Sequence, residues 1–466
     1  MAVGAFVAGS CVSRAAEPPA TVFDRIGADA LASQKAPGLA IAIVRDGQIV
    51  YVKGFGLADV AHKVPVEPDT RFAIGSLTKQ FTAASILLLA ERRKLGLDDQ
   101  LSKYLPSFPN ASAIKLHMLL NQTSGLHDYP FIREHPWPLS GPIELETLVA
   151  ILATDTSDFA PGTRWEYSNA NYALLSAVIA KASGLDEAAF LQQNVFDPLK
   201  MTSSGFGYEA QRQPGLAKAY QGRAPFQPQP SASLDLFAGA GAVVSNAPDV
   251  AAWDIALMQG GLLDASSMRA LWSAGKLQSG ASTGYAMGFI PATLAGHREV
   301  WHNGLAPGAG GYSYNAIFPD DKLAVVVLSN GYNFDGVPEQ IVSRVLAAYD
   351  SSASWPATTI APPSPAPGED PAVTMRAKDW FHRLQTGTVD MSRVEPTFAQ
   401  RLTPALLAQI RASLAGEGIP TDWVYMGSQT VPGATIYSYW IRLAGVPHVW
   451  SIGLSPAGKI AGSQLQ

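Results

Sequence analysis

The stretch AIGSLTKQFTAA, Ala73–Ala84, places a serine and a lysine three residues apart where an apolar helix begins. Residues three apart on a helix lie on the same face, so the Lys79 amine can reach the Ser76 hydroxyl. The residues that follow, 81–89, are mostly apolar. Such surroundings remove water from an ammonium group and favour the neutral amine, which can accept the proton of a serine nucleophile. The stretch therefore predicts a buried helix with a nucleophilic serine at its start.

A Ser-x-x-Lys pair is by itself a weak signal, because a chain of this length is expected to contain about one by chance. A second pair, Ser273 and Lys276, has no apolar helix after it, and we interpret it as a solvated surface turn. The GASTG stretch at 280–284 matches Gly-x-Ser-x-Gly. A nucleophile elbow needs a strand before it and a helix after it, and neither flanks Ser282. Ser76 is therefore the preferred nucleophile.

The stretch PGTRWEYSNANYALL, 161–175, places Tyr167-Ser168-Asn169 just before a predicted helix. A phenol near a buried lysine can be held as a phenolate and act as a second base. The Asn169 amide can both donate to and accept from a substrate amide. The alternative is structural: Tyr167 is a half-buried aromatic residue and Asn169 a helix cap.

The stretch WHNGLAPGAGGYSYNAIF, 301–318, contains His302-Asn303-Gly304 ahead of a glycine-rich segment and a strand. Glycine lets a substrate lie close against the backbone, whereas a lone histidine is more often structural.

Two further features concern histidines elsewhere in the chain. In the loop at His127–Tyr129, either end residue contacts substrate or only shapes the loop. The eight histidines lack the spacing of a metal site. We expect no metal and no cofactor.

Composition limits the class of protein. The chain has 466 residues, of which 47% are hydrophobic and 15% charged, which favours a large globular protein of two domains. The net charge of −5 argues against a nucleic-acid partner. One cysteine, Cys11, excludes a disulfide framework. The apolar run 86–90 is too short to cross a bilayer.

The first twenty residues are small and apolar and then turn polar, like the core and cleavage region of a secretory signal. Ser13 and Ala15 occupy the small-residue positions of such a site. The segment ending at Cys11 is also compatible with a weak lipoprotein signal and a lipid anchor. The alternative is an unstructured N-terminus. We expect a periplasmic or secreted protein, with membrane anchoring as a variant of that expectation.

Patterning along the chain predicts a mixed α/β fold, with an antiparallel sheet formed by N- and C-terminal segments and helices between them. Asp46-Gly47 between two apolar runs indicates a hairpin. Cations at 92–94 and Gly96 indicate where the first apolar helix ends. The predicted domains are a signal-like segment (1–20), a catalytic domain (21–352), a Pro-rich linker (353–371) and a small α+β domain (372–466). The aromatic residues of this last domain are expected in its core: Trp423, Tyr425, Tyr437, Tyr439, Trp440 and Trp450.

The three motifs occur in the order and rough spacing of penicillin-recognising serine hydrolases. The chain resembles the β-lactamase / D-Ala-D-Ala carboxypeptidase-like family, in the branch of class C β-lactamases, D-aminopeptidases and esterases. The resemblance covers roughly residues 23–349 and includes MLLNQTSGL and FAGAGAVVSNAPDVAAW. It implies a β-lactamase/transpeptidase-like sheet with an all-helical subdomain. The C-terminal part looks like the cystatin-like or nuclear-transport-factor-like domains that sometimes follow this catalytic domain.

By that resemblance, Ser76 is acylated, and Lys79 and Tyr167 share its proton and return it to the leaving group. Asn169 would bind the substrate's amide, and Gly304 would shape the edge of the strand. The backbone N–H groups of Ser76 and Leu305 would form the oxyanion hole. These residues would act on a small-molecule or peptide substrate.

His302 stands where many β-lactamases have lysine. Lysine is charged at ordinary pH and suits a substrate carboxylate, whereas an unperturbed histidine titrates near ~6.5. We therefore expect hydrolysis of an amide or ester bond, in a D-residue peptide or a small acyl substrate, rather than efficient β-lactam turnover. The alternatives are a β-lactamase proper, or a catalytically weak protein that binds penicillin or cell-wall fragments. The presence of all four polar catalytic candidates favours the enzyme.

Overall fold

The structure is a computed structural model, and it describes most of the chain. The described residues are 18–129, 140–154, 157–229, 232–306, 308, 310–350, 365–414, 418–431, 433–443 and 446–465. Residues 1–17 of the signal-like segment, which include Cys11, Ser13 and Ala15, lie outside them, as does the linker stretch 353–364. The predictions made for those segments therefore stay predictions.

Two compact units make up the chain. The larger comprises Met1–Ala292 and Gly296–Ser354, and the smaller comprises Thr293–Ala295 and Trp355–Gln466. Each unit contains a sheet and helices, which confirms the predicted mixed α/β class.

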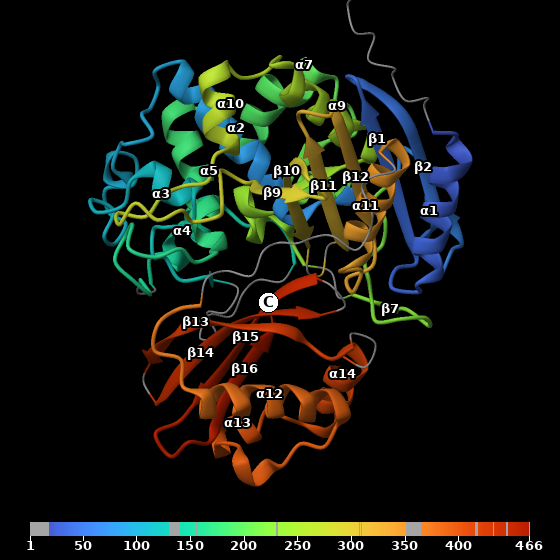
Figure 1. Ribbon diagram of the computed structural model, residues 1–466. Helices are drawn as coiled ribbons and strands as arrows, with labels where there is room; N and C mark the ends of the chain where they lie inside the picture. Colours follow the sequence, from blue (N-terminus) through green and yellow to red (C-terminus); the bar gives the residue numbers. More distant parts are fainter. Residues whose placement is uncertain are drawn as a thin grey trace, which may run out of the picture. The chain divides into compact units, whose positions relative to one another are not determined.

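The larger unit is built on a seven-stranded sheet in the order β3-β2-β1-β12-β11-β10-β9, counted over the described residues. Its N-terminal strands β1 and β2 lie beside late strands β10 to β12, although the segments are far apart in the sequence (Figure 1). The ranges of these strands are β1 Gly38–Arg45, β2 Gln48–Asp59, β3 Val64–Pro65, β9 Ile290–Leu294, β10 His297–Leu305, β11 Tyr312–Phe318 and β12 Leu323–Ser329. Shorter strands form smaller sheets: β4 Phe72–Ala73, β5 Gly205–Phe206, β6 Tyr220–Gln221, β7 Gln227–Pro228 and β8 Val243–Ser245.

The pairing of β1 explains why the sheet joins both ends of the unit. Leu39 pairs with Ser329 on β12 and with Phe55 on β2, antiparallel on both sides. Every residue of β12 is buried, as expected for a strand covered on both faces. Asp46 and Gly47 have φ values of 50° and 77°, the pair of positive φ angles that a tight hairpin turn requires. The hairpin and the antiparallel sheet predicted from sequence are therefore confirmed.

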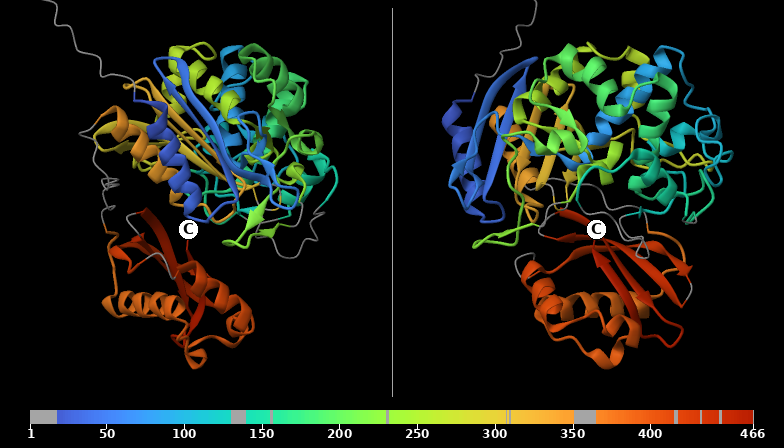
Figure 2. Two further views of the ribbon diagram at one scale, coloured as in Figure 1. Left: turned by 90° about the vertical axis from the view of Figure 1, so that its right-hand side faces the viewer. Right: turned by 180° about the vertical axis from the view of Figure 1, so that it is seen from behind.

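Helices cover both faces of this sheet. Helices α1 and α11 lie together on one face of the sheet (Figure 2). Helix α9 packs against strands β1 and β12. The helices of the larger unit are α1 Ala20–Ala32, α2 Thr78–Glu91, α3 Leu116–Leu120, α4 Leu145–Leu152, α5 Asn169–Ser183, α6 Glu187–Leu191, α7 Asp197–Leu199, α8 Gly207–Arg212, α9 Ala247–Gln259, α10 Ala265–Trp272 and α11 Val337–Tyr349. Short 3₁₀ turns include η1 Gly75–Leu77 and η6 Ala238–Ala240.

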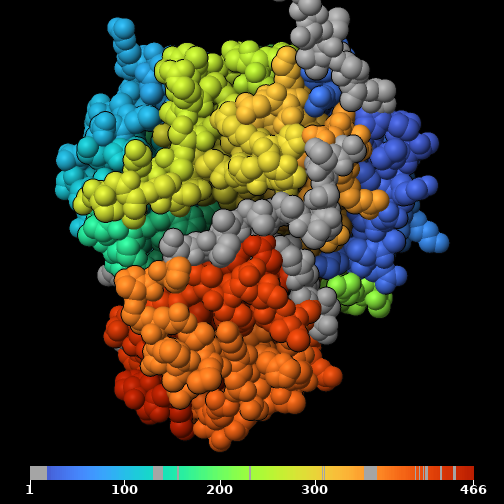
Figure 3. Space-filling model, viewed as in Figure 1, coloured from blue at the N-terminus to red at the C-terminus, as the bar shows by residue number. Residues whose placement is uncertain are grey.

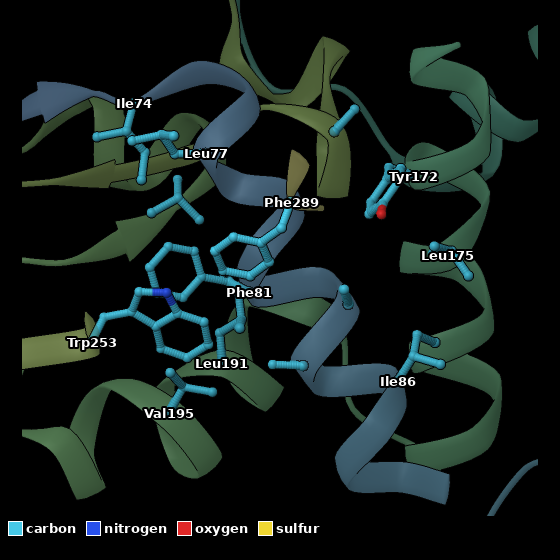
Figure 4. Packing of buried hydrophobic residues seen from close by; sticks show 14 of the residues in the cluster. Ile74, Leu77, Phe81, Ile86, Tyr172, Leu175, Leu191, Val195, Trp253 and Phe289 are labelled. Carbon is cyan, nitrogen blue, oxygen red and sulfur yellow. The ribbon is translucent and has the colours of Figure 1, made fainter. Parts of the chain in front are cut away.

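Helix α2 runs through the centre of the hydrophobic core. The Phe81 ring lies 4.3 Å from that of Trp253 on α9 and 6.0 Å from that of Phe196, centroid to centroid. Figure 4 shows Phe289 close to Phe81 and Trp253, and Leu175 and Tyr172 of α5 on the opposite side of α2. Because α2 is buried on all sides, its position is fixed by packing, and the residues at its N-terminus are fixed with it.

The end of α2 differs from the sequence-based expectation. The helix ends at Glu91 with no basic residue in its last turn, and the left-handed conformation after it belongs to Arg93, with φ of 56°, rather than to Gly96. The Gly96 N–H instead donates to the Asp99 carboxylate in the following turn. Across the part of the chain that the structure describes, no helix combines the length and apolar character needed to span a bilayer.

The smaller unit is an antiparallel four-stranded sheet in the order β13-β14-β15-β16, with helices packed on it. Of the six aromatic residues expected in its core, Tyr425, Tyr439, Trp440 and Trp450 are buried and Trp423 and Tyr437 are partly buried. The Trp450 ring contacts Phe381 edge-to-face at 5.0 Å. The elements are α12 Pro371–Thr386, α13 Pro396–Ala399, α14 Pro404–Leu414, β13 Thr421–Val431, β14 Ala434–Leu443, β15 Val446–Leu454 and β16 Ile460–Leu465.

Candidate active site

Ser76 lies in the short turn η1, directly before α2. The preceding Gly75 has φ of 53°, in the left-handed region that favours glycine. A Cβ added to Gly75 would lie 2.6 Å from the backbone nitrogen of Leu305 at the end of β10. Glycine therefore allows the turn that carries Ser76 to pack directly on the backbone of this strand, while Ser76 itself stays half-exposed.

Lys79 is fully buried, yet its amine has three polar partners. Nζ donates to Ser76 Oγ at 3.0 Å, to Asn169 Oδ1 at 2.8 Å and to the Ala240 carbonyl at 2.7 Å. Burial lowers the pKa of Lys79 to about 7, and the negative charge of Asp128 opposes that shift. Near neutral pH the amine therefore exists in both protonation states, so it can accept a proton and give it up again.

Tyr167 completes the contact with the serine from a distant part of the chain. Its hydroxyl donates to Ser76 Oγ at 2.7 Å, and the Lys79 amine lies 4.8 Å from its ring centroid. Burial raises the pKa of Tyr167 well above its usual value of 10. Tyr167 is therefore a neutral phenol, which argues against the phenolate that the sequence left open, and desolvation is the largest cause of the shift. As a neutral phenol it can still donate a proton.

Asn169 is the first residue of α5, and both ends of its side chain are held. Oδ1 faces Lys79, while Nδ2 lies 3.2 and 3.3 Å from the two carboxylate oxygens of Asp128. The backbone N–H of Asn169 also donates to Asp128, at 2.8 Å. The helix cap position belongs to Ser168, whose side chain makes no capping bond. Asp128 therefore takes the capping role from another loop.

His302 lies on β10 close to the same group of residues. One ring nitrogen contacts the Asn303 carbonyl, which only accepts, so the ring donates there and Nε2 accepts from Tyr285 at 3.0 Å. Burial and the neighbouring Lys79 charge lower the pKa of His302 to about 3. The imidazole is therefore neutral throughout the ordinary pH range.

A buried network holds the carbonyl that faces Lys79. The Thr82 hydroxyl on α2 lies 2.7 Å from Glu187 Oε1 and 2.8 Å from the Gly239 carbonyl oxygen. Ser176 on α5 contacts the other Glu187 oxygen and accepts from the Gly239 N–H at 2.7 Å. Burial raises the pKa of Glu187 to about 7. These bonds tie η6, and with it the Ala240 carbonyl, to α2, α5 and α6.

Three functional neighbours escaped sequence reasoning: Asp128, Glu187 and Tyr285. Asp128 lies inside the His127–Tyr129 loop, where only the two flanking residues were considered. Of those, Tyr129 is buried and donates to the Leu236 carbonyl, while His127 pairs with Asp158 at 3.0 Å. The signal that could have found Asp128 is an acid two residues after the QTSGL stretch.

The rejected serines lie on the surface. Ser282 and the pair Ser273 and Lys276 are exposed, and Figure 3 shows their segment, coloured yellow, at the surface of the molecule. Ser273 Oγ donates to the Arg269 carbonyl and not to a base. Among the described residues, no group of three or more His, Cys, Asp and Glu side chains could hold a metal ion.

Gly304 supports a prediction about how tightly β10 and the Ser76 turn are packed. A Cβ at this position would lie 2.0 Å from the Ile74 carbonyl oxygen and 2.3 Å from Ser313 Oγ. Gly304→Ala should therefore push the turn away from the strand, lowering the free energy of unfolding by about 1–3 kcal/mol. It should also lower kcat/KM for p-nitrophenyl acetate at least about tenfold, because small misplacements of reacting groups are costly. Urea unfolding and initial rates measure both effects.

The matched control is Gly462→Ala on β16, where an added Cβ meets nothing within 4 Å. It should change neither stability nor rate appreciably. If Gly304→Ala behaved like Gly462→Ala, the close packing of β10 on the turn would not matter for the site.

Comparison with known proteins places this geometry in context. Residues 23–348 match the family described as "Beta-lactamase". Penicillin-binding protein 4* of Bacillus subtilis is 30% identical over 302 residues, which cover 61% of this chain and 66% of that protein. The D-aminopeptidase of Gluconobacter oxydans is 28% identical over 67% of this chain and 58% of its own length. The chain thus spans less than two thirds of either relative.

A solved structure shares the fold of the larger part of the chain. The D-amino acid amidase from Ochrobactrum anthropi SV3, complexed with L-phenylalanine, aligns with a TM-score of 0.62 at 22% identity. The alignment covers 72% of this chain and 100% of the amidase. At this level of identity the likeness concerns the fold.

Proposed function

This chain belongs to the Beta-lactamase family of serine hydrolases, and we propose that Ser76 is the residue that becomes acylated. One observation carries the proposal: Ser76 Oγ lies 3.0 Å from Lys79 Nζ and 2.7 Å from the Tyr167 hydroxyl. A hydroxyl between an amine that titrates near neutral pH and a neutral phenol has both a base and a proton donor within reach.

The reaction proposed from this arrangement has two halves. Ser76 Oγ attacks the carbonyl carbon of the substrate and its proton passes to the neutral Lys79 amine. The bond to the leaving group then breaks, and Tyr167 supplies the proton to the departing amine or alcohol and is reprotonated from Lys79. A water molecule then gives a proton to Lys79 and attacks the acyl carbonyl carbon; the bond to Ser76 Oγ breaks, the proton returns from Lys79 to Oγ, and the acid product leaves. We assign the oxyanion hole to the backbone N–H groups of Ser76 and Leu305.

The other site residues position these groups. Asn169 accepts from the Lys79 amine, so its proposed contact with a substrate amide requires it to exchange one of the partners it already has. His302 supports the site through Tyr285, and Gly304 leaves room for the Ser76 turn. We propose that these three residues shape the substrate-binding side of the site.

The preferred substrates are amides or esters of D-residue peptides or of small acyl groups. Two observations favour this class over a β-lactam. The pKa of His302 is lowered to about 3, so this residue offers no positive charge to a substrate carboxylate at neutral pH. One relative is named a D-aminopeptidase. A second candidate, a penicillin-binding protein with slow turnover, is favoured by the name of another relative.

A labelling experiment combined with a substrate panel tests the proposal. The protein is treated with a fluorophosphonate and with a fluorescent penicillin, and peptide mass spectrometry locates the adduct. We expect the adduct on Ser76, and hydrolysis of p-nitrophenyl esters and D-amino-acid anilides at higher kcat/KM than nitrocefin. Fast nitrocefin turnover would instead identify a β-lactamase, and a penicillin adduct that persists for hours would identify a binding protein. Labelling of Ser282 would overturn the assignment.

We also propose that the protein works in the periplasm or outside the cell. The small, apolar composition of residues 1–15 supports this location. Fractionation of cells that express the full chain, with a blot for the larger unit, tests it.

A further inference from the structure

Asp128 lies at the centre of a group of contacts that the three sequence motifs do not include. Its carboxylate accepts the backbone N–H and the side-chain NH₂ of Asn169, at 2.8 to 3.3 Å. An ionised carboxylate is only an acceptor. It therefore admits one orientation of the Asn169 amide, with the NH₂ group towards Asp128 and the oxygen towards Lys79.

The oxygen oriented in this way lies 2.8 Å from the Lys79 amine. Asp128 thus acts on the lysine along two routes, through the amide and through its own charge, which favours the protonated amine. The pKa of Asp128 is itself raised by burial, while the Asn169 hydrogen bonds and the Lys79 charge oppose that shift. These opposing contacts favour the ionised form that the geometry requires.

The surroundings of this pair contain few other charges. The titratable neighbours of the Asp128 carboxylate, apart from Lys79, are His127, Tyr129, Glu166 and Tyr167. Lys79 additionally lies near the Tyr172 ring and the neutral His302. The tyrosines among these neighbours, Tyr129, Tyr167 and Tyr172, are neutral phenols because burial raises the pKa of each. Asp128 is therefore the negative charge that acts on the lysine.

We propose that Asp128 is a positioning residue for the hydrolase: it fixes the Asn169 amide with its oxygen towards Lys79 and keeps the lysine basic enough to take the serine proton. This inference rests on the function proposed for Ser76. It explains how a lysine with no exposed surface can still bind a proton near neutral pH, since full burial without a counter-charge would hold the amine neutral and weakly basic.

Removing the Asp128 charge should change the pKa of Lys79 in a definite direction. Without Asp128, the protonated form of Lys79 loses its stabilising partner, so the pKa of Lys79 falls. The rate of acylation rises with pH as Lys79 loses its proton, so the acid limb of the pH–rate profile must move to lower pH. An asparagine at this position has one acceptor oxygen instead of two, so it can keep the bonds that Asp128 Oδ1 accepts but loses the bond that Oδ2 accepts from Asn169.

The test measures acylation of the full chain as a function of pH. Wild type, Asp128→Asn and Asp128→Glu are reacted with a fluorophosphonate and with p-nitrophenyl acetate between pH 5 and 9. In Asp128→Asn we expect the acid limb to move down by about one pH unit and the plateau rate to fall about 10- to 100-fold. Asp128→Glu keeps the charge, so its limb should stay near that of wild type even if its rate falls.

The matched control is Asp158→Asn. It removes a carboxylate that pairs with His127, next to Asp128 in the chain, without touching Asn169 or Lys79. It should leave the limb in place. Thermal unfolding checks that each variant folds, and Asp128→Ser replaces Asp128→Asn if the latter does not.

The outcomes separate the two proposals. If wild type is not labelled on Ser76, the proposed function fails. If wild type is labelled but the acid limb is unchanged in folded Asp128→Asn or Asp128→Ser, the role of Asp128 fails and the function stands. An equal shift in Asp158→Asn or in Asp128→Glu would also overturn it, because the effect would then not come from this charge.

Discussion

Ser76→Ala is expected to lower kcat/KM for p-nitrophenyl acetate by at least about 10³-fold. The serine oxygen is the atom on which Lys79 and Tyr167 converge, at 3.0 and 2.7 Å. Without it, the base and the proton donor have no nucleophile to act on, and the remaining groups can only bind the substrate. Initial rates over a range of substrate concentrations, with burst-phase absorbance at 405 nm, measure the loss of acylation.

Two controls make this result specific. Ser282→Ala removes the serine of the Gly-x-Ser-x-Gly stretch, which is exposed, and should keep full activity. Ser76→Ala should unfold at the temperature of wild type within a few degrees, because the side chain is small and half-exposed. Activity above about a tenth of wild type in folded Ser76→Ala would mean that another residue is acylated.

The first apolar helix shows what local sequence can decide. The spacing of Ser76 and Lys79, together with the apolar run that follows, placed both residues correctly at the start of a buried helix. The end of that helix was predicted less well. Glycine at Gly96 suggested the stop, but the left-handed position falls on Arg93, where the chain turns sooner.

The state of the polar groups was harder to predict. The sequence left open a phenolate at Tyr167, because a lysine lies near it, yet desolvation is the largest influence on the pKa of both groups. Desolvation depends on every atom that packs around the group, and one sequence does not list those atoms. The same holds for His302, whose pKa is lowered by burial and by the nearby Lys79 charge.

Asp128, Glu187 and Tyr285 were missed for a different reason. Each reaches the site across a large sequence separation: Asp128 contacts a residue 41 positions away, and Glu187 contacts one 105 positions away. Such contacts have no periodicity, so no local pattern marks them. They follow from the way α2, α5 and the sheet pack, which the sequence specifies only through the whole fold.

Lys79→Arg should lower kcat/KM for p-nitrophenyl acetate by about 10²–10⁴-fold at every pH between 6 and 9. Arginine keeps the positive charge and can still donate hydrogen bonds, but it does not give up its proton in this range. The lysine can, because burial lowers its pKa to about 7, so wild-type kcat/KM should rise with pH through a midpoint near 7. The substitution thus separates the charge of residue 79 from its ability to act as a base.

The shape of the pH profile decides the result. In Lys79→Arg the limb near pH 7 should disappear together with the activity, while fluorescence of the buried tryptophans reports that the fold is intact. A folded Lys79→Arg protein with a tenth or more of wild-type kcat/KM would show that the amine acts as a fixed charge and that the Ser76 proton leaves by another group. Tyr167→Phe would then be the decisive variant, since the phenol is the other group within hydrogen-bonding distance of that oxygen.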